Sequence, residues 1–206
     1  MDTRDMVKIL FTGADAFRDQ LLDKQLLYAY MANDEFHYIE VVFKKQSFQH
    51  LTGIKIPDIK SGDFFDRCLA RKISYREIQP AKDGTTPLKL RILENAIKGI
   101  ECAQMVGVYD NSRFYLKTDH LVGNVHWCMG FVYNDKKNMD ALLYANTLLN
   151  EDLRKIVLRP FYRVSFVAKK DKIHPTYSYK NITWQQENAN VGSIVETLKI
   201  AHLFME

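Results

Sequence analysis

The chain has 206 residues, of which 47% are hydrophobic and 12% aromatic, and its formal net charge is +4. This length and composition predict one folded domain over residues 1–206 and exclude a largely disordered chain, which would be poorer in apolar residues. The mild positive charge permits a nucleic-acid partner without requiring one, since the sequence pI of 8.8 lies just below the values above about 9 typical of dedicated nucleic-acid binders.

The cysteines and the absence of long apolar runs indicate the cellular compartment in which the protein occurs. The cysteines Cys68, Cys102 and Cys128 are far apart and odd in number, which indicates neither a disulfide framework nor a CxxC zinc site. No apolar run approaches the ~20 residues of a membrane span, and the first residues are acidic where a secretion signal would be basic. We therefore expect a cytoplasmic protein that does not enter a membrane.

The first elements are predicted from hydrophobic spacing. Apolar residues from Leu10 to Tyr28 recur at intervals of three, four and seven residues, which predicts a helix over residues 5–31, weakened by Gly13. After a turn, residues 36–44 are rich in aromatic and β-branched side chains, which predicts a strand.

Residues 43–54, FKKQSFQHLTGI, follow directly on that strand. We expect them to hold His50 at the exit of a sheet, with Lys44 and Lys45 close by. Gly53 can adopt a positive φ and suits a turn or a helix stop. A histidine beside cations suits either acid/base chemistry or binding to a phosphodiester.

The elements predicted after residue 54 include both helices and strands. Thr86 and Pro87 are typical of a helix start, and Gly99 of a helix stop. Asp110-Asn111-Ser112 reads as the turn of a hairpin. The predicted helices lie at 61–71, 88–98, 147–157 and 194–204 (the last capped by Ser193), the strands at 105–109, 113–116, 126–133 and 161–169, and the loops at 80–87 and 175–190. Helices precede a later antiparallel sheet without a βαβ rhythm, which predicts an α+β fold.

Four short motifs carry a family resemblance. They are Phe48-x-His50-Leu51-x-Gly53, Phe64-Phe65-Asp66-Arg67-Cys68-Leu69 with Lys72-Ile73, Arg91-Ile92-Leu93, and Leu116-Lys117-Thr118-Asp119. From the first helix to Phe166 the chain resembles the phage-associated branch of the barnase–EndoU–colicin–RelE-like ribonuclease families. The resemblance implies N-terminal helices packed on a mostly antiparallel sheet, and a metal-independent ribonuclease of the kind carried by phages and mobile elements, as toxins are.

His50 is the first candidate for chemistry. With a pKa near ~6.5, an imidazole can act as base or acid at neutral pH. RNA cleavage needs a base for the 2′-hydroxyl, an acid for the leaving 5′-oxygen, and cations for the phosphate oxygens. Lys44, Lys45 and Thr52 are its neighbours in sequence. The alternative is that His50 satisfies a local hydrogen bond while Phe48 and Leu51 fill the core.

Lys117 to His120 form the second candidate group. On a strand, Lys117 and Asp119 would share one face, and Thr118 and His120 the other. Lys117 matches the family pattern and suits a phosphate contact. We prefer to interpret His120 as a solvated hairpin residue, although with Thr118 it could form a second acid/base pair. His126 has a weaker case, because its neighbour Trp127 indicates a packing role.

The last predicted strand supplies the third group. Arg163 and Ser165 point to one side of it and resemble the last-strand cation and hydroxyl of such nucleases, while Tyr162 points to the other side as a possible substrate contact. The alternative is an ordinary edge strand with alternating polar residues. Arg91 could reach the same cleft or could pair with Glu94.

No phosphate-binding, dinucleotide-binding or zinc-protease motif occurs, and the acidic residues show no two-metal pattern. We therefore predict RNA cleavage by 2′-hydroxyl attack with no metal or other cofactor. His50, Thr52, Lys117, Arg163 and Ser165 would be catalytic, and Lys44, Lys45, Arg91 and Tyr162 would bind substrate. RNA is the expected partner, with an antitoxin or immunity protein as a second. The alternative function is an inactive RNA- or protein-binding module of the same fold.

Overall fold

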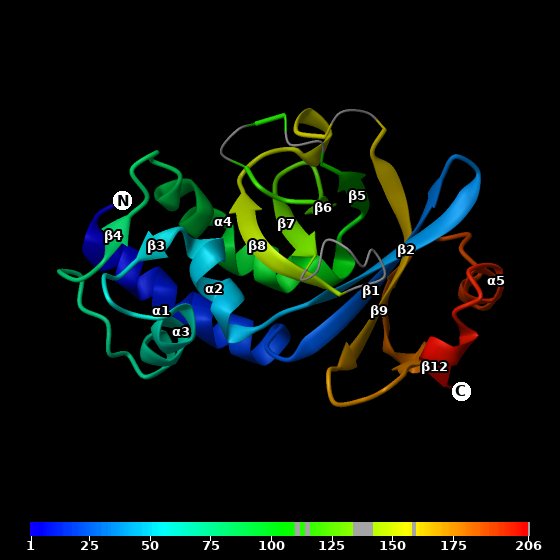
Figure 1. The fold of residues 1–206 in the computed structure, drawn as a ribbon, viewed down its shortest axis with the longest axis horizontal. Coiled ribbons are helices and arrows are strands. Elements are labelled where there is room, and N and C mark those ends of the chain that lie inside the picture. The colour runs from blue at the N-terminus through cyan, green and yellow to red at the C-terminus, as the bar shows by residue number, and fades with distance from the viewer. Residues whose placement is uncertain (110–111, 114–115, 134–141, 158–159, 206) are drawn as a thin grey trace.

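The computed structural model describes residues 1–109, 112–113, 116–133, 142–157 and 160–205. Its fold is α+β, as predicted, with helices beside a large and mostly antiparallel sheet. The four longer helices gather at one end of the molecule, the strands fill the middle, and the short C-terminal helix α5 lies at the other end (Figure 1). The α-helices are α1 (Thr3–Gln20), α2 (Lys45–Thr52), α3 (Ser61–Leu69), α4 (Thr86–Gly99) and α5 (Val191–Thr197).

The main sheet closes on itself. Its hydrogen-bonded order is β1-β2-β8-β7-β6-β5-β9-β11, and an additional pairing of β1 with β9 completes a ring of seven strands. Only β2 and β8 pair in parallel within it. These strands are β1 (Lys24–Ala32), β2 (Glu35–Val42), β5 (Met105–Val108), β6 (His120–Gly123), β7 (Cys128–Tyr133), β8 (Leu143–Leu149), β9 (Tyr162–Asp171) and β11 (Ile182–Gln185).

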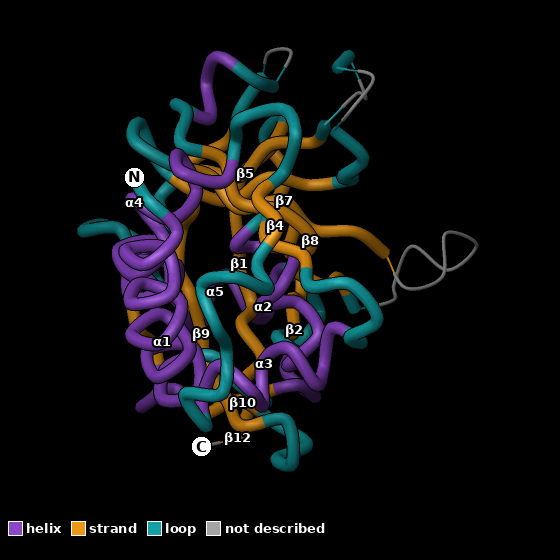
Figure 2. Tube along the Cα trace, turned by 90° about the vertical axis from the view of Figure 1, so that its left-hand side faces the viewer, coloured by secondary structure: helices purple, strands orange, loops and turns teal. Residues whose placement is uncertain are grey.

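Shorter elements complete the described chain. The two-residue strands form two small pairs, β3 with β4 and β10 with β12, and four 3₁₀ turns connect longer elements. These elements are β3 (Ile54–Lys55), β4 (Gln79–Pro80), β10 (Tyr177–Ser178), β12 (Phe204–Met205), η1 (Ile100–Cys102), η2 (Leu153–Lys155), η3 (Tyr179–Asn181) and η4 (Ala201–Leu203). Figure 2 shows the helices α1 and α4 running side by side along one flank of the strands.

The largest hydrophobic cluster lies between these helices and the sheet. Phe17 of α1, Phe48 of α2 and Phe65 of α3 meet edge to face, with ring centroids 5.2–5.5 Å apart. Gly13, which the sequence marked as a weak point of the first helix, lies inside an unbroken α1. A Cβ there would come within 2.6 Å of the Leu93 side chain of α4. Glycine at this position therefore lets the two helices approach.

The prediction of one helix over residues 5–31 is wrong in its second half. The helix ends at Gln20, Asp23 adopts a positive φ of 56°, and Lys24–Ala32 form strand β1. Residues 26–30 are buried on both faces of β1, because one face packs toward the helices and the other toward the C-terminal segment. A strand buried on both faces gives a continuous apolar run rather than alternation, so its spacing could be mistaken for that of a helix.

The setting of His50 also differs from the prediction. Strand β2 ends at Val42, and Lys45–Thr52 form helix α2, so His50 lies in the last turn of a helix rather than at the exit of a sheet. Phe48 and Leu51 bury one face of that helix. Gly53 ends it at a φ of 68°, as its sequence position suggested.

The hairpin after β5 is formed by a different partner from the one predicted. Strand β5 pairs with His120–Gly123, and the described residues of 113–116 are not in a strand. Asp110 and Asn111 of the predicted turn, and residues 114–115, lie outside the described residues. The Tyr109 amide donates a hydrogen bond to the carbonyl of Asp119, just before the strand that pairs with β5.

Three C-terminal predictions need smaller corrections. The segment 147–157 continues β8 to Leu149 and then forms the 3₁₀ turn η2. The predicted loop 175–190 contains β10, η3 and β11. The last helix is α5, which begins at Val191 and is capped by the side chain of Asn190 rather than of Ser193.

Candidate functional site

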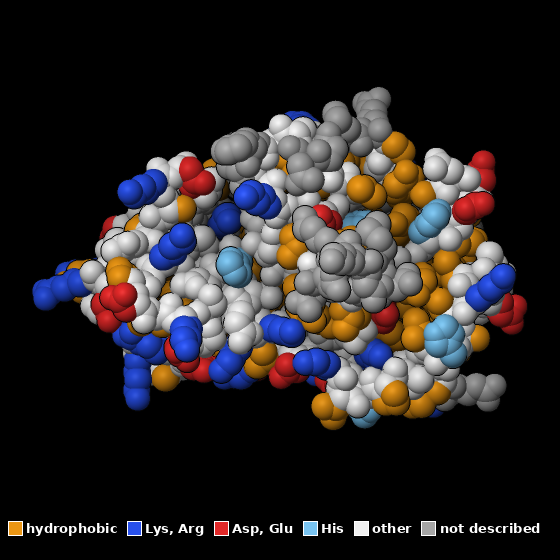
Figure 3. All heavy atoms as spheres, in the orientation of Figure 1, with side chains coloured by type: hydrophobic (Ala, Val, Ile, Leu, Met, Phe, Trp, Pro, Cys, Tyr) orange, Lys and Arg blue, Asp and Glu red, His pale blue; other side chains and the backbone are white. Residues whose placement is uncertain are grey.

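A pocket of about 450 Å³ opens where α2, β3, α4 and β8 meet. Its polar lining comes mainly from His50, Lys55, Lys89 and Asn146. The other lining residues are Gln49, Gly53, Ile54, Ile56, Ile59, Ser61 and Ala81. Lys and Arg side chains gather on the face of the molecule over α2, β3 and α4 (Figure 3), so this pocket lies in a positively charged region.

His50 stands at the rim of the pocket, in the last turn of α2, and its side chain reaches solvent. The pocket walls nevertheless withdraw water from the ring, and this desolvation lowers the pKa of His50 below its ordinary value. The positive charges of Lys89 and Lys55 lower that pKa further. The imidazole is therefore neutral at pH 7, which is the form that can accept a proton.

Lys89 projects from α4 into the same pocket. Its Nζ lies 3.4 Å from the backbone oxygen of His50 and 3.3 Å from the Thr147 hydroxyl. Partial burial lowers the pKa of the Lys89 ammonium, and the charge of Asp83 opposes that change. A Cβ at Gly53 would lie 3.1 Å from Lys89 Cδ, so the glycine that ends α2 also leaves room for the lysine stem.

Asn146 is presented by a β-bulge. Gly130 pairs with Thr147 and Phe131 with Ala145, which leaves Asn146 as the extra residue of β8. Its amide nitrogen donates to the Lys117 backbone oxygen at 2.5 Å, and its amide oxygen accepts from the Thr118 hydroxyl at 3.3 Å. Bulges commonly re-aim side chains near functional sites. Here the bulge ties the Lys117 segment to the wall of the His50 pocket.

The hydrogen bonds of Asn146 hold the Lys117 segment in place, and a substitution can test whether this matters for activity. We expect Asn146→Ala to lower the rate of any reaction that the pocket catalyses about 3- to 10-fold, because it removes hydrogen bonds that hold the Lys117 segment beside the pocket. The measurement is kcat/KM at fixed pH and salt. Asn150→Ala is the matched control, since Asn150 is exposed just beyond the end of β8. Equal rates in the two variants would contradict the role of Asn146.

Several sequence-predicted residues lie near the pocket without lining it. Lys117 is exposed, and its backbone is joined to the pocket through Asn146. Lys44 places its ammonium 4.1 Å from the centre of the Tyr144 ring, two residues before Asn146. Lys45 instead forms an ion pair with Asp66 at 2.7 Å, which reduces its value as a phosphate contact.

Thr52 is fully buried, which does not fit a role in orienting substrate or His50. Its hydroxyl donates to the Gln49 backbone oxygen at 2.8 Å and accepts from the Ile54 amide at 3.2 Å. The side chain therefore shapes the turn at Gly53, which in turn sets the pocket wall.

The third group of predicted residues lies elsewhere. Arg163 and Ser165 share one side of β9, as expected, but they line a different pocket from His50. Tyr162 is half-buried and stacks on Tyr30, with centroids 5.6 Å apart. The structure thus separates the last-strand cation from the imidazole, because β9 pairs with β1 and β5 while α2 packs beside β8.

Arg91 does not face the His50 pocket. Two residues along a helix correspond to about 200° of rotation, so Arg91 projects away from the side of α4 that carries Lys89. Its predicted alternative partner, Glu94, forms an ion pair with Lys98 at 2.6 Å.

His120 is buried rather than a solvated hairpin residue, which corrects the preferred interpretation. Its Nε2 lies 2.9 Å from the Tyr133 hydroxyl, and its Nδ1 has no hydrogen-bond partner among the described residues. Burial lowers the pKa of His120. The nearest acceptor of the Thr118 hydroxyl is the Phe131 backbone oxygen, at 3.0 Å, so Thr118 and His120 do not form a side-chain pair. Trp127 is buried, as expected for a packing role.

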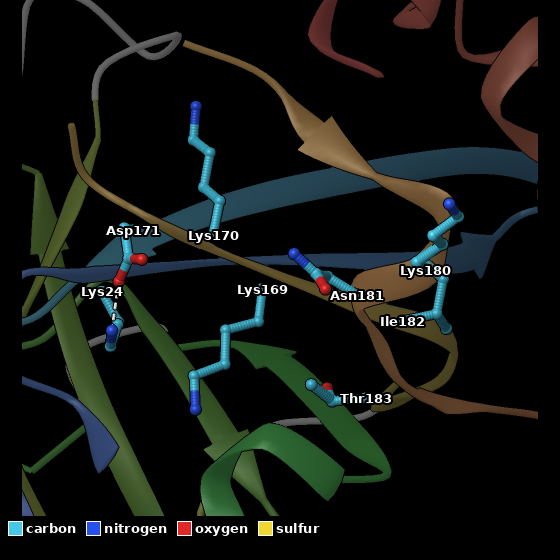
Figure 4. A pocket seen from close by; sticks show the side chains of 8 residues that line it. All are labelled: Lys24, Lys169, Lys170, Asp171, Lys180, Asn181, Ile182 and Thr183. Atoms are coloured by element: carbon cyan, nitrogen blue, oxygen red, sulfur yellow. Dashed lines mark hydrogen bonds and ion pairs between the residues drawn. The ribbon is translucent and has the colours of Figure 1, made fainter. Parts of the chain in front are cut away.

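A second lysine-rich pocket, of about 350 Å³, lies between β9 and the segment 180–183 (Figure 4). Lys24 pairs with Asp171, and Lys169 pairs with Glu101 at 2.6 Å. Lys170 points away from Lys169 and donates to the Pro175 backbone oxygen at 2.8 Å. Two of the four lysines that line this second pocket are thus already paired with carboxylates. In the His50 pocket, the Lys89 ammonium instead contacts a backbone carbonyl and a hydroxyl.

Comparison with known protein families identifies the family of this chain. The model of a family described as phage-Barnase-EndoU-ColicinE5/D-RelE like nuclease4 (PBECR4) matches residues 9–201. The chain belongs to this family. The match confirms the resemblance seen in the sequence motifs and indicates a nuclease of the barnase/EndoU/RelE type. No curated protein matches the chain, and no solved structure does.

Within the described residues, no helix combines the length and apolar character needed to span a membrane. The same part of the chain contains no group of three or more His, Cys, Asp or Glu side chains that could hold a metal ion.

Sequence reasoning missed Lys89, Lys55 and Asn146. Lys89 stands between two apolar residues of a predicted helix, and Asn146 lies beside Thr147 in a mainly apolar segment. Neither position carries a recognisable motif. The one available signal was the adjacent polar pair Asn146-Thr147 within LYANTLL, because it lies at the place where the strand bulges.

Proposed function

We propose that this nuclease cleaves RNA without a metal ion, by attack of a 2′-hydroxyl on the adjacent phosphodiester. The observation that carries the proposal is the His50 pocket. This pocket places the neutral imidazole of His50 near the half-buried ammonium of Lys89 and near Lys55. None of its eleven lining residues is acidic. Such a lining favours an anionic substrate and offers no carboxylate to a divalent cation.

In the proposed reaction, His50 acts as the base and Lys89 as the acid. Neutral His50 accepts the proton of the 2′-hydroxyl as the 2′-oxygen bonds to phosphorus. The bond from phosphorus to the 5′-oxygen breaks, which yields a 2′,3′-cyclic phosphate and a 5′-hydroxyl. Lys89, whose pKa is lowered by burial, donates a proton to the leaving oxygen. Lys55 and the exposed Lys117 attract the phosphate backbone, and solvent restores both protonation states.

The test compares four oligonucleotides of one sequence: all-ribose, all-deoxyribose, and two mixed strands with a single 2′-deoxy residue, either at the cleavage site or one position away. With EDTA present, we expect cleavage of the all-ribose strand and of the second mixed strand only. The products should carry a cyclic phosphate. Loss of cleavage on adding EDTA, or cleavage of the all-deoxyribose strand, would contradict the proposal.

One observation favours a second function. Arg163 and Ser165 lie outside the His50 pocket, and His120 is buried, so the pocket lacks a second imidazole. A catalytically inactive module that binds RNA would show salt-dependent binding without cleavage. An acidic inhibitor protein, such as an antitoxin, would suit the lysines of the same face by charge complementarity. In either case we propose that residues 1–206 act as one domain.

A further inference from the structure

Arg163 lies at the junction of two neighbouring pockets. The first, about 440 Å³, is formed between β9, the β1–β2 hairpin and the start of α5, and the second, about 310 Å³, between β5, β9 and β11. Arg163 and Gln186 line both. Each volume falls within the range of about 300–1,000 Å³ found for small-ligand sites. The two pockets therefore form one groove divided by a guanidinium group.

The charge of this groove is concentrated at its centre. Among the described residues that line the two pockets, Arg163 is the one charged side chain. It is exposed, and no ion pair or hydrogen bond of its guanidinium to another described residue occurs. A planar fork of donors without a protein partner suits a phosphate or carboxylate group. The groove thus offers one anion site between two neutral compartments.

Each compartment combines an apolar wall with polar groups. In the smaller pocket the wall is Trp184, a half-buried ring on β11, and Gln104 and Gln186 supply amides. In the larger pocket the wall is Phe36 and Met31. Aromatic walls with amide donors and acceptors are typical of sites that hold unpaired bases.

Ser165 marks the floor of the larger pocket. Its side chain belongs to a residue that is only 6% exposed, yet it lines the pocket. The Ser165 hydroxyl, two residues from Arg163 on the same side of β9, is available to a ligand that enters this pocket.

We infer that this groove binds a dinucleotide unit of single-stranded nucleic acid, with its phosphodiester on Arg163 and one nucleoside in each pocket. One negative charge between two neutral, partly aromatic groups is the chemical pattern that the lining matches. The inference rests on the proposed function only for the class of ligand, a nucleic-acid strand. Because the groove shares no lining residue with the His50 pocket, it acts as a second contact on the strand.

Trp184 provides the measurement. We expect a 2′-O-methyl dinucleoside monophosphate, which cannot be cleaved by 2′-hydroxyl attack, to quench Trp184 fluorescence saturably. Arg163→Ala should weaken this binding about 10- to 100-fold, as expected for loss of a hydrogen bond to a charged group. The logarithm of the binding constant should fall with the logarithm of salt concentration with a slope of about −0.7, for one phosphate contact. The deoxyribose dinucleotide, titrated in parallel, reports whether the sugar is recognised.

Three controls make the result decisive. Arg76→Ala removes an exposed arginine outside the groove and should change nothing, while Trp184→Phe should abolish the signal. A dinucleotide with an uncharged methylphosphonate linkage should bind wild type as weakly as the charged ligand binds Arg163→Ala. Unchanged binding in Arg163→Ala, or quenching that persists in Trp184→Phe, would overturn the inference. His50→Ala should leave this titration unaltered, so failure of the cleavage proposal is observed separately.

Discussion

Replacing His50 with alanine is expected to lower the rate of RNA cleavage by about 10²- to 10⁴-fold, the usual contribution of a positioned general acid or base. The reason is that His50 is the one histidine among the residues lining its pocket, and its pKa is lowered so that it is neutral at pH 7. The measurement is kcat/KM on an RNA oligonucleotide, with folding of the variant checked by thermal unfolding.

His202→Ala is the matched control, because His202 is an exposed histidine near the C-terminus and away from the pocket. We expect it to retain wild-type activity. If His50→Ala and His202→Ala cleave RNA equally fast, the assignment of His50 fails.

The dependence of kcat/KM on pH provides a second test of the role of His50. Since the pKa of His50 is lowered in the folded protein, the rising acid limb of kcat/KM should have its midpoint below the ordinary histidine pKa of about 6.5. Lys89→Met removes a positive charge that contributes to this lowering. The acid limb of kcat/KM for the Lys89→Met variant should therefore have its midpoint at a higher pH than that of the wild-type protein. A limb that stays in place would show that another group is titrating.

The second large effect concerns stability. We expect Phe48→Ala to reduce the free energy of unfolding by about 3–5 kcal/mol, as for other fully buried phenylalanines. Phe48 is completely buried and contacts the rings of Phe17 and Phe65 with centroids 5.5 and 5.2 Å apart. This loss is a large part of the roughly 5–15 kcal/mol by which domains are stable.

Denaturant unfolding at constant pH measures the change. Phe11→Ala is the control, because Phe11 is a half-buried residue of α1, and its loss should be clearly smaller. Phe48 lies two residues before His50 on α2, so cleavage by Phe48→Ala should fall at temperatures where the variant is still mostly folded. Equal destabilisation by both replacements would mean that the phenylalanine cluster does not anchor α2.

Much of the fold follows from local sequence. The helix around Leu88, the strand from Phe36 and the stop at Gly53 were predicted because propensity, capping and glycine conformation act over a few neighbouring residues. The family was identified in the same way, from short motifs around His50 and Lys117, and the family match confirms it.

The errors arose where tertiary contacts override local preference. The spacing of apolar residues predicts helix where β1 forms, because both faces of this strand are covered, by the N-terminal helices and by the C-terminal segment. The partner of β5 was missed because the chain pairs at His120, beyond the nearest turn signal.

The sequence by itself determined the α+β class, the family, and the presence of a histidine among cations. The tertiary structure alone decided which cations share a pocket with that histidine. Closure of the sheet between β1 and β9 carries Arg163 to a separate groove, while α4 and the bulge in β8 bring Lys89 and Asn146 to His50. The physical reason is that a pocket is assembled from segments up to about a hundred residues apart, and no local pattern records which of them will meet.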